Sequence, residues 1–204
     1  SVWTAAAGEG PAEKSPERAG PFKDAFRNRM LLVYGTGGDA EERAWALAKA
    51  RYDAETFWYR GNGSVEILAD TDYDPGRFAE RNVILYGNAD MNAAWSRALA
   101  PGCPLIVRRG WLQVGERAFA GEDMACLFVY PHRRREWTRT LVGVVAGSGG
   151  PGMRATNQLP YFVSGVAYPD WTVLGVEALQ KGSKGVRGAG FFDRHWRLLE
   201  PAFR

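Results

Sequence analysis

The sequence predicts an α/β fold of the Rossmann-like, three-layer type, with a mostly parallel mixed sheet and an antiparallel hairpin portion. Two observations lead to this prediction. First, the chain contains two units in which an apolar run of strand length is followed by a Gly-containing polar turn and then by a helical pattern. Alternating strands and helices with right-handed crossovers place their strands parallel in one sheet. Second, the short apolar runs after Pro104 are separated by turns that leave no room for helices, which is typical of hairpins.

The first strand-turn-helix unit starts with residues 30–34, which are apolar throughout, as expected for a strand covered on both faces. Residues 35–38 form the turn. Asp39 and Glu42 match a capping box, which predicts a helix over about 40–58. The expected apolar side of this helix consists of Ala40, Ala44, Leu47 and Ala48.

The remaining elements follow in order along the chain. The sequence Gly-Asn-Gly at 61–63 ends the first helix, because glycine tolerates the left-handed conformation at a helix C-cap. A second helix is expected at about 91–99. We expect further strands at 65–68, 82–86, 105–108, 111–114, 126–130, 140–146 and 161–166, with 171–174 as a continuation of the last.

Length and composition predict one domain. The chain has 204 residues, of which 46% are hydrophobic, and we place a single α/β domain at 20–204. Residues 1–19 lack an initiator Met and an apolar signal core, and are typical of a linker or terminal extension. We therefore expect an upstream segment or domain, and the localisation stays unknown. No apolar run approaches the roughly 20 residues needed to cross a bilayer, which predicts a soluble domain.

The composition argues against nucleic acid and metal ions as partners. The formal net charge of +3 is small, and the basic residues are scattered except at 132–135, where we expect a solvated turn. Cys103 and Cys126 lack metal-type spacing, and the only histidines are His132 and His195, so no metal site is predicted. Buried free thiols are expected, with a disulfide as the alternative in an oxidising compartment.

Three Gly-containing polar turns, at 35–39, 87–90 and 147–152, follow predicted strands. The carboxyl ends of parallel strands meet at one edge of a sheet, and ligands of open α/β sheets bind outside that edge. We therefore predict that a small anionic or nucleotide ligand, if the domain binds one, lies at this edge. The predicted ligand-binding residues are Gly35, Thr36, Gly37, Gly38, Asn88, Gly147, Ser148, Gly149 and Gly150.

The motif at 147–152 fits the G-x-G-x-x-G pattern of dinucleotide sites, with Asp170 as the acid that would hold a ribose. Only 153–159 is left for a crossover helix, which is too short, and Pro169 interrupts the approach to Asp170. The turn at 35–39 could cradle an anion but lacks the Lys of a P-loop. In both turns the alternative is that the glycines serve only the backbone. No cofactor is predicted.

A serine hydrolase triad needs an exposed nucleophile, a base within reach and an acid that orients the base. The chain contains no G-x-S-x-G sequence, and we expect no catalytic residue in it. An autonomous esterase would have to draw on the nucleophiles Ser148 and Ser164, the bases His195 and His132, and the acids Asp170 and Asp193.

Eight tryptophans are many for a chain of this length. They could form platforms on which sugars stack. Trp45, Trp58 and Trp95, however, fall on predicted helices, where packing against the sheet is favoured.

Four motifs carry a family resemblance: Gly-Pro-Phe-Lys-Asp-Ala-Phe at 20–26, Val-Tyr-Gly-Thr at 33–36, Val-Ile-Leu-Tyr-Gly-Asn at 83–88, and Leu-Pro-Tyr-Phe-Val-Ser-Gly-Val-Ala-Tyr-Pro-Asp at 159–170. Together they resemble the C-terminal region of large bacterial proteins of the prolyl-oligopeptidase-like α/β-hydrolase type. The resemblance covers nearly the whole chain from about Gly20. It implies that a hydrolase domain with the nucleophilic serine lies upstream, and it assigns no catalytic residue to the region itself.

Three hypotheses follow. The first is an accessory domain without its own triad, which packs against the upstream hydrolase domain of the same protein. The second is a Rossmann-like binding module or enzyme for a small anionic or nucleotide ligand at the glycine-rich edge. The third is an autonomous serine esterase that uses Ser148 or Ser164 with His195.

Overall fold

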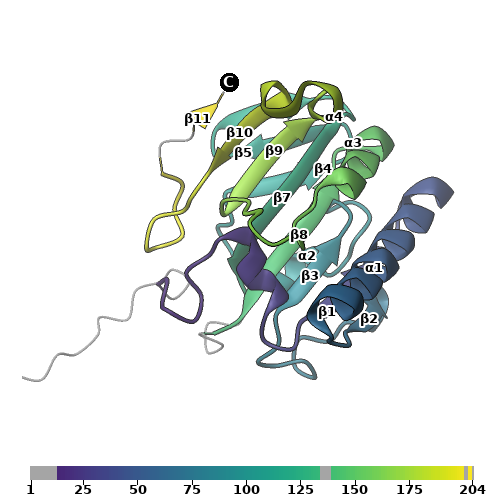
Figure 1. Ribbon diagram of the computed structural model, residues 1–204, viewed down its shortest axis with the longest axis vertical. Coiled ribbons are helices and arrows are strands. Elements are labelled where there is room, and N and C mark those ends of the chain that lie inside the picture. Colours follow the sequence, from purple (N-terminus) through teal and green to yellow (C-terminus); the bar gives the residue numbers. More distant parts are fainter. Residues whose placement is uncertain (1–12, 134–138, 200–201, 204) are drawn as a thin grey trace, which may run out of the picture.

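The computed structural model, which describes residues 13–133, 139–199 and 202–203, has the predicted α/β fold (Figure 1). Within these residues, one mixed sheet has eight strands in the order β11-β10-β9-β7-β8-β3-β1-β2, and a second sheet has the order β4-β5-β6. The large sheet is parallel from β8 to β2, whereas its other pairings are antiparallel. Its strands are β1 (Leu31–Tyr34), β2 (Glu66–Ala69), β3 (Val83–Tyr86), β7 (Met124–Pro131), β8 (Leu141–Gly147), β9 (Trp171–Gly175), β10 (Val186–Gly190) and β11 (Ala202–Phe203).

The smaller sheet is a pair of hairpins. The strands at 105–108 and 111–114 are as predicted, but the strand at 117–120 was not expected, and the hairpins form a separate sheet and not part of the main one. It consists of β4 (Leu105–Arg108), β5 (Trp111–Val114) and β6 (Arg117–Ala120). The helices are α1 (Ala40–Gly61), α2 (Trp95–Ala98), α3 (Gly150–Ala155) and α4 (Ala178–Lys181), with the 3-10 turns η1 (Phe22–Phe26), η2 (Asp70–Asp72), η3 (Thr156–Gln158) and η4 (Gly182–Gly185). None of the helices described is long and apolar enough to span a membrane.

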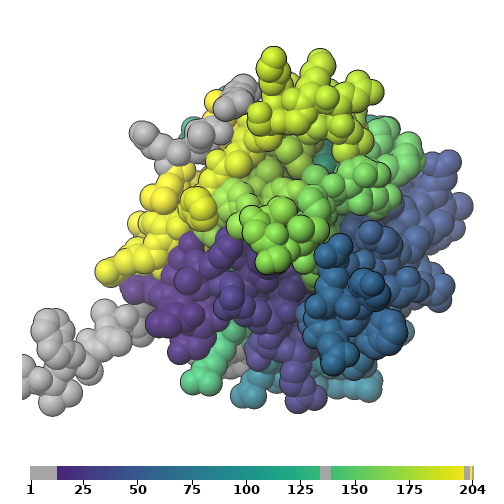
Figure 2. All heavy atoms as spheres, in the orientation of Figure 1, coloured from purple at the N-terminus to yellow at the C-terminus, as the bar shows by residue number. Residues whose placement is uncertain are grey.

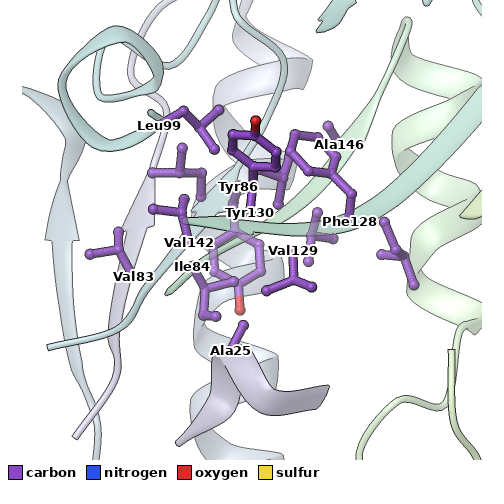
Figure 3. Close-up of a cluster of buried hydrophobic side chains, with 14 of the residues drawn as sticks. Ala25, Val83, Ile84, Tyr86, Leu99, Phe128, Val129, Tyr130, Val142 and Ala146 are labelled. Carbon is purple, nitrogen blue, oxygen red and sulfur yellow. The ribbon is translucent and has the colours of Figure 1, made fainter. Parts of the chain in front are cut away.

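The strand register divides the molecule into three layers. Phe128 of β7 lies opposite Val144 of β8, and the Phe128 ring centroid is 5.8 Å from that of Trp95 in α2. Successive residues of a strand point to opposite faces. Gly143 accordingly faces the other layer, where a Cβ built on it would lie 2.8 Å from the Cβ of Ala25 in η1. Figure 3 shows this core, with side chains of β3, β7 and β8 between Ala25 and Leu99.

Helix α1 begins as the sequence predicts. The Asp39 carboxylate accepts a hydrogen bond of 2.9 Å from the Glu42 amide, and the Asp39 amide donates to the Glu42 carboxylate at 2.9 Å. The predicted apolar side, however, is wrong. The buried positions of the helix are Glu42, Ala46, Lys49, Ala50 and Asp53, whereas Ala40, Ala44 and Ala48 are exposed. A side of the helix chosen by hydrophobicity misses the buried face, because three of the buried residues are charged, and two of them are Lys49 and Asp53.

These two charged residues form a buried network between α1 and the sheet. Lys49 Nζ lies 2.8 Å from Asp53 Oδ1. The Tyr86 hydroxyl on β3 donates to Asp53 Oδ2 at 2.9 Å, and the Tyr161 hydroxyl donates to the same oxygen. Burial raises the pKa of Asp53 and lowers that of Lys49, and the ion pair opposes both shifts. The Asp53 carboxylate therefore connects α1 to β3 and to the turn that contains Tyr161.

Two other predicted elements differ in the structure. Residues 161–166 form turns and not a strand, and the rings of Tyr161 and Phe162 pack against Phe26, with centroids 5.3 and 4.7 Å apart. The helix predicted at 91–99 is a single turn, α2. Of the tryptophans expected to pack on the sheet, Trp95 is 7% exposed, but Trp58 is 65% exposed.

We predict that Asp53→Asn lowers the free energy of unfolding by about 3–5 kcal/mol, because the buried Lys49 ammonium loses its counter-charge. Urea unfolding measures this loss. Glu55→Gln, on an exposed position of the same helix, is the matched control and should change stability by less than about 0.5 kcal/mol. Equal effects of the two substitutions would contradict the role assigned to Asp53.

Candidate functional site

The three glycine-containing turns do lie along one edge of the sheet. They follow β1, β3 and β8, which are neighbours and parallel. In the sheet, β2 lies on one side of β1 and β3 lies on the other. The strand order therefore reverses between β1 and β3, and this place is called the switch point. Residues 35–38 and 87–90 flank that point. The sequence therefore predicted the location of this edge correctly, while ligand binding there stays a prediction.

At the switch point the chain's own backbone packs against the first turn. The Gly37 amide donates to the Met91 carbonyl at 2.9 Å. A Cβ built on Gly35 would lie 2.8 Å from the same carbonyl oxygen, and one on Gly37 2.9 Å from it. These glycines are thus required for close approach between two protein segments, which is the alternative that the sequence left open for this turn.

Asp70, which the sequence analysis did not select, joins the two turns. Its carboxylate accepts hydrogen bonds from the Thr36 amide at 3.1 Å, the Thr36 hydroxyl at 2.6 Å and the Ala93 amide at 2.6 Å. Asp70 directly follows β2, so it lies at the carboxyl end of the fourth parallel strand. That position is the signal by which it could have been found.

The third turn is also occupied by internal contacts. The buried Ser148 hydroxyl accepts a hydrogen bond from the Met124 amide at 3.1 Å, and the Ser148 amide donates to the Met124 carbonyl at 2.9 Å. A Cβ on Gly152 would lie 2.1 Å from that carbonyl oxygen, and one on Gly149 2.5 Å from the Glu122 Cβ. The G-x-G-x-x-G glycines therefore let the short helix α3 pack against the start of β7.

Paired charges surround the turns. Arg108 Nη1 lies 2.5 Å from the Asp90 carboxylate, and the Arg109 guanidinium pairs with Glu42, the residue that completes the α1 capping box. Asn88 bridges two turns, since its amide donates to the Gly147 carbonyl at 3.2 Å. Across the described ranges, no group of three or more His, Cys, Asp or Glu side chains could hold a metal ion.

Two of the triad candidates, Ser148 and Asp170, lie at opposite ends of the strands of the sheet. Ser148 pairs with Met124, whereas Asp170 accepts from the Val129 amide, five positions further along β7. At about 3.3 Å per residue, Ser148 and Asp170 are roughly 17 Å apart. The Asp170 carboxylate instead binds Lys14 Nζ at 2.5 Å and the Phe192 amide at 2.8 Å.

The remaining candidates are engaged elsewhere or exposed. His195 Nδ1 lies 3.3 Å from Glu13, and Asp193 accepts from the His195 amide at 2.8 Å. His132, expected in a solvated turn, is buried, with Nε2 2.8 Å from the Tyr73 hydroxyl. Residues 134 and 135 of that basic cluster lie outside the described residues. Ser164 is exposed in the turns after Pro160. Cys103 and Cys126 are free thiols.

Comparison with known proteins identifies no family whose sequence profile matches the chain, and no curated protein that matches it. The functional interpretation therefore depends on the geometry of the described residues and on the motifs of the sequence.

We predict that Gly152→Ala lowers the free energy of unfolding by about 1–3 kcal/mol or more, because its Cβ would collide with the Met124 backbone. Gly150→Ala is the matched control in the same helix. Its Cβ would meet only the end of the Arg154 side chain, at 3.2 Å, so little loss is expected. Denaturant unfolding of both variants is the measurement, and equal losses would argue against the packing role of Gly152.

Proposed function

We propose that this chain is an accessory domain that packs against an upstream α/β-hydrolase domain of the same protein and adds no triad of its own. The observation that carries the proposal is an apolar groove, described next. The motifs at 20–26 and 159–170 resemble the C-terminal region of such hydrolases. Each motif contributes residues to the lining of this groove.

The groove consists of two hollows that share Tyr168, and we call it the Tyr168 groove. The larger hollow, about 610 Å³, lies beside α4, and the smaller, about 340 Å³, lies beside residues 19–21. Leu179 in the first is 51% exposed, and Phe191 in the second is 54% exposed. Figure 2 shows the segment around 159–170 in green between η1 in purple and α4 in yellow-green, on one face of the molecule. The other lining side chains include Leu159, Leu174, Ala178, Val186, Pro21 and Pro169.

The chemistry of the groove favours a protein partner. None of the described residues that line it carries a charged side chain, so it has no cation to pair with the charge of a nucleotide or another anion. Contiguous exposed apolar surface is typical of interaction sites. Ala19, Gly20 and Pro21 line the smaller hollow, and the residues before them contact another part of the domain, where the Lys14 amide donates to the Arg194 carbonyl at 2.8 Å.

The internal contacts at the glycine-rich edge support the same proposal over the two alternatives. The Ser148 hydroxyl is buried and accepts the Met124 amide, which is a structural role for a candidate nucleophile. The Thr36 hydroxyl donates to the Asp70 carboxylate beside the switch point. An autonomous esterase and a ligand site at this edge would each need these groups to exchange their partners.

The first test is to read the gene upstream of the codon for Ser1. The proposal predicts an open frame that encodes an α/β-hydrolase domain with a G-x-S-x-G sequence. A frame that encodes no such domain would overturn the proposed function.

The second test locates the interface. We expect the double substitution Leu179→Ser and Phe191→Ser to weaken binding to the separately produced upstream domain by at least about tenfold in titration calorimetry, because two exposed apolar contacts are lost. Tyr59→Ser is the matched control, since Tyr59 is 83% exposed on α1 and does not line the groove. Unchanged affinity of the double variant would exclude the Tyr168 groove as the interface.

A further inference from the structure

A second concave site lies on the opposite face of the central sheet, in the layer of α2 and the small sheet. It is a pocket of about 350 Å³ between α2, the segment that follows it, and β4. Trp95, whose ring packs on Phe128, forms part of its wall together with Leu99 and Leu105. These three side chains are almost fully buried. The volume is within the range of roughly 300–1,000 Å³ that is typical of small-molecule sites.

Two arginines line this pocket, which we call the arginine pocket, and no carboxylate among the described residues does. Arg133 is held against the wall, because its amide donates to the Ala98 carbonyl and its Nη1 to the Ser96 carbonyl, both at 2.6 Å. Arg108 uses Nη1 to bind Asp90 at 2.5 Å. A guanidinium has five N–H donors, so each keeps donors beyond these bonds.

Cys103 contributes to the apolar wall and not to a reactive centre. Its thiol donates to the Leu105 carbonyl at 3.5 Å, and burial raises its pKa to about 12. The thiol is therefore protonated and uncharged near neutral pH. The site combines a hydrocarbon wall with the guanidinium of Arg133, which among the described residues binds only a backbone carbonyl, and that of Arg108, whose charge is paired with Asp90.

We propose that the arginine pocket binds a small amphiphilic anion, namely an aliphatic or aromatic carboxylate. The hydrocarbon part would lie against Trp95, Leu99 and Leu105, and the carboxylate would accept hydrogen bonds from Arg108 or Arg133, whose planar guanidinium groups match its geometry. None of the residues predicted to bind a ligand at the glycine-rich edge lines this pocket. The inference is independent of the proposed hydrolase-associated function.

The test uses the full chain and octanoate as the probe, with titration calorimetry as the readout. Saturable one-to-one binding of octanoate is expected, with 1-octanol at least about tenfold weaker because it lacks the charge. Inorganic phosphate, which lacks the hydrocarbon, should not saturate the site. Absence of octanoate binding, or equal affinity for octanol, would overturn the proposal. Phosphate binding as strong as that of octanoate would also overturn it.

Site variants separate charge from packing. Arg133→Gln combined with Arg108→Gln should weaken octanoate at least about tenfold and leave octanol unchanged. Arg109→Gln is the matched control, since this neighbouring arginine does not line the pocket. Full octanoate affinity in the double variant would contradict the assignment. Because Arg108 also binds Asp90, the melting temperature of each variant is compared, and the single Arg133→Gln variant keeps the test valid if the double variant does not fold.

A second readout does not depend on the arginines. Alkylation of Cys103 at alkaline pH should be slowed by octanoate, because the thiol lines the pocket, whereas Cys126 is fully buried. Cys103→Ser should abolish the protected labelling. Binding of octanoate without any protection of Cys103 would place the ligand elsewhere and overturn the site.

Discussion

The carboxylate of Asp53 connects three parts of the chain that are far apart in sequence. It pairs with Lys49 on α1 and accepts hydrogen bonds from Tyr86 on β3 and Tyr161 in the turns beyond α3. Removing a charge from water is costly unless it is paired and fully hydrogen-bonded, so this arrangement holds only when helix, sheet and turn are all in place. The position of α1, and with it the turn that leads from β1 into α1, depends on this network.

At the edge of the sheet, turns and strand ends bind one another through internal contacts. Many open α/β sheets bind a ligand at the switch point of the strand order. In this protein the Met91 carbonyl and the Asp70 carboxylate lie there, and they bind the backbone of the first turn. The Thr36, Asp70 and Ser148 groups that a ligand there would use are thus bound by other parts of the protein.

Local rules predicted much of the fold. The capping box of Asp39 and Glu42 and the strands with continuous apolar runs are encoded by neighbouring residues, and each was found. The face of α1 was not, because it contains Lys49 and Asp53, an i,i+4 pair that becomes buried only when Tyr86 and Tyr161 from outside the helix bind the Asp53 carboxylate. Residues 161–166 have the composition of a strand, but their rings pack against Phe26 and the chain turns instead.

Helix length explains the misplaced tryptophan. The 22 residues of α1 extend about 33 Å, whereas the four residues of β1 extend only about 13 Å, so the helix runs past the strand it covers. Trp58 and Tyr59 lie in the last turns of the helix and are exposed there. The hydrophobic pattern of a helix does not depend on the length of the strand it covers, so the sequence of α1 alone could not predict this exposure. Asp70 escaped prediction for a related reason, since it gains its role only when β2 is placed beside β1.

The two concave surfaces differ in the kind of partner they suit, and the sheet keeps them apart. Leu174 of the Tyr168 groove lies opposite Ala125 in the register, whereas Phe128, which packs on Trp95 of the arginine pocket, is three positions further along β7. An odd separation along a strand reverses the face. A domain docked in the uncharged groove would therefore leave the arginine pocket open on the other face. On both proposals together, this chain would bind a protein partner and a small anion at the same time, and any coupling between the two sites would have to pass through the central strands.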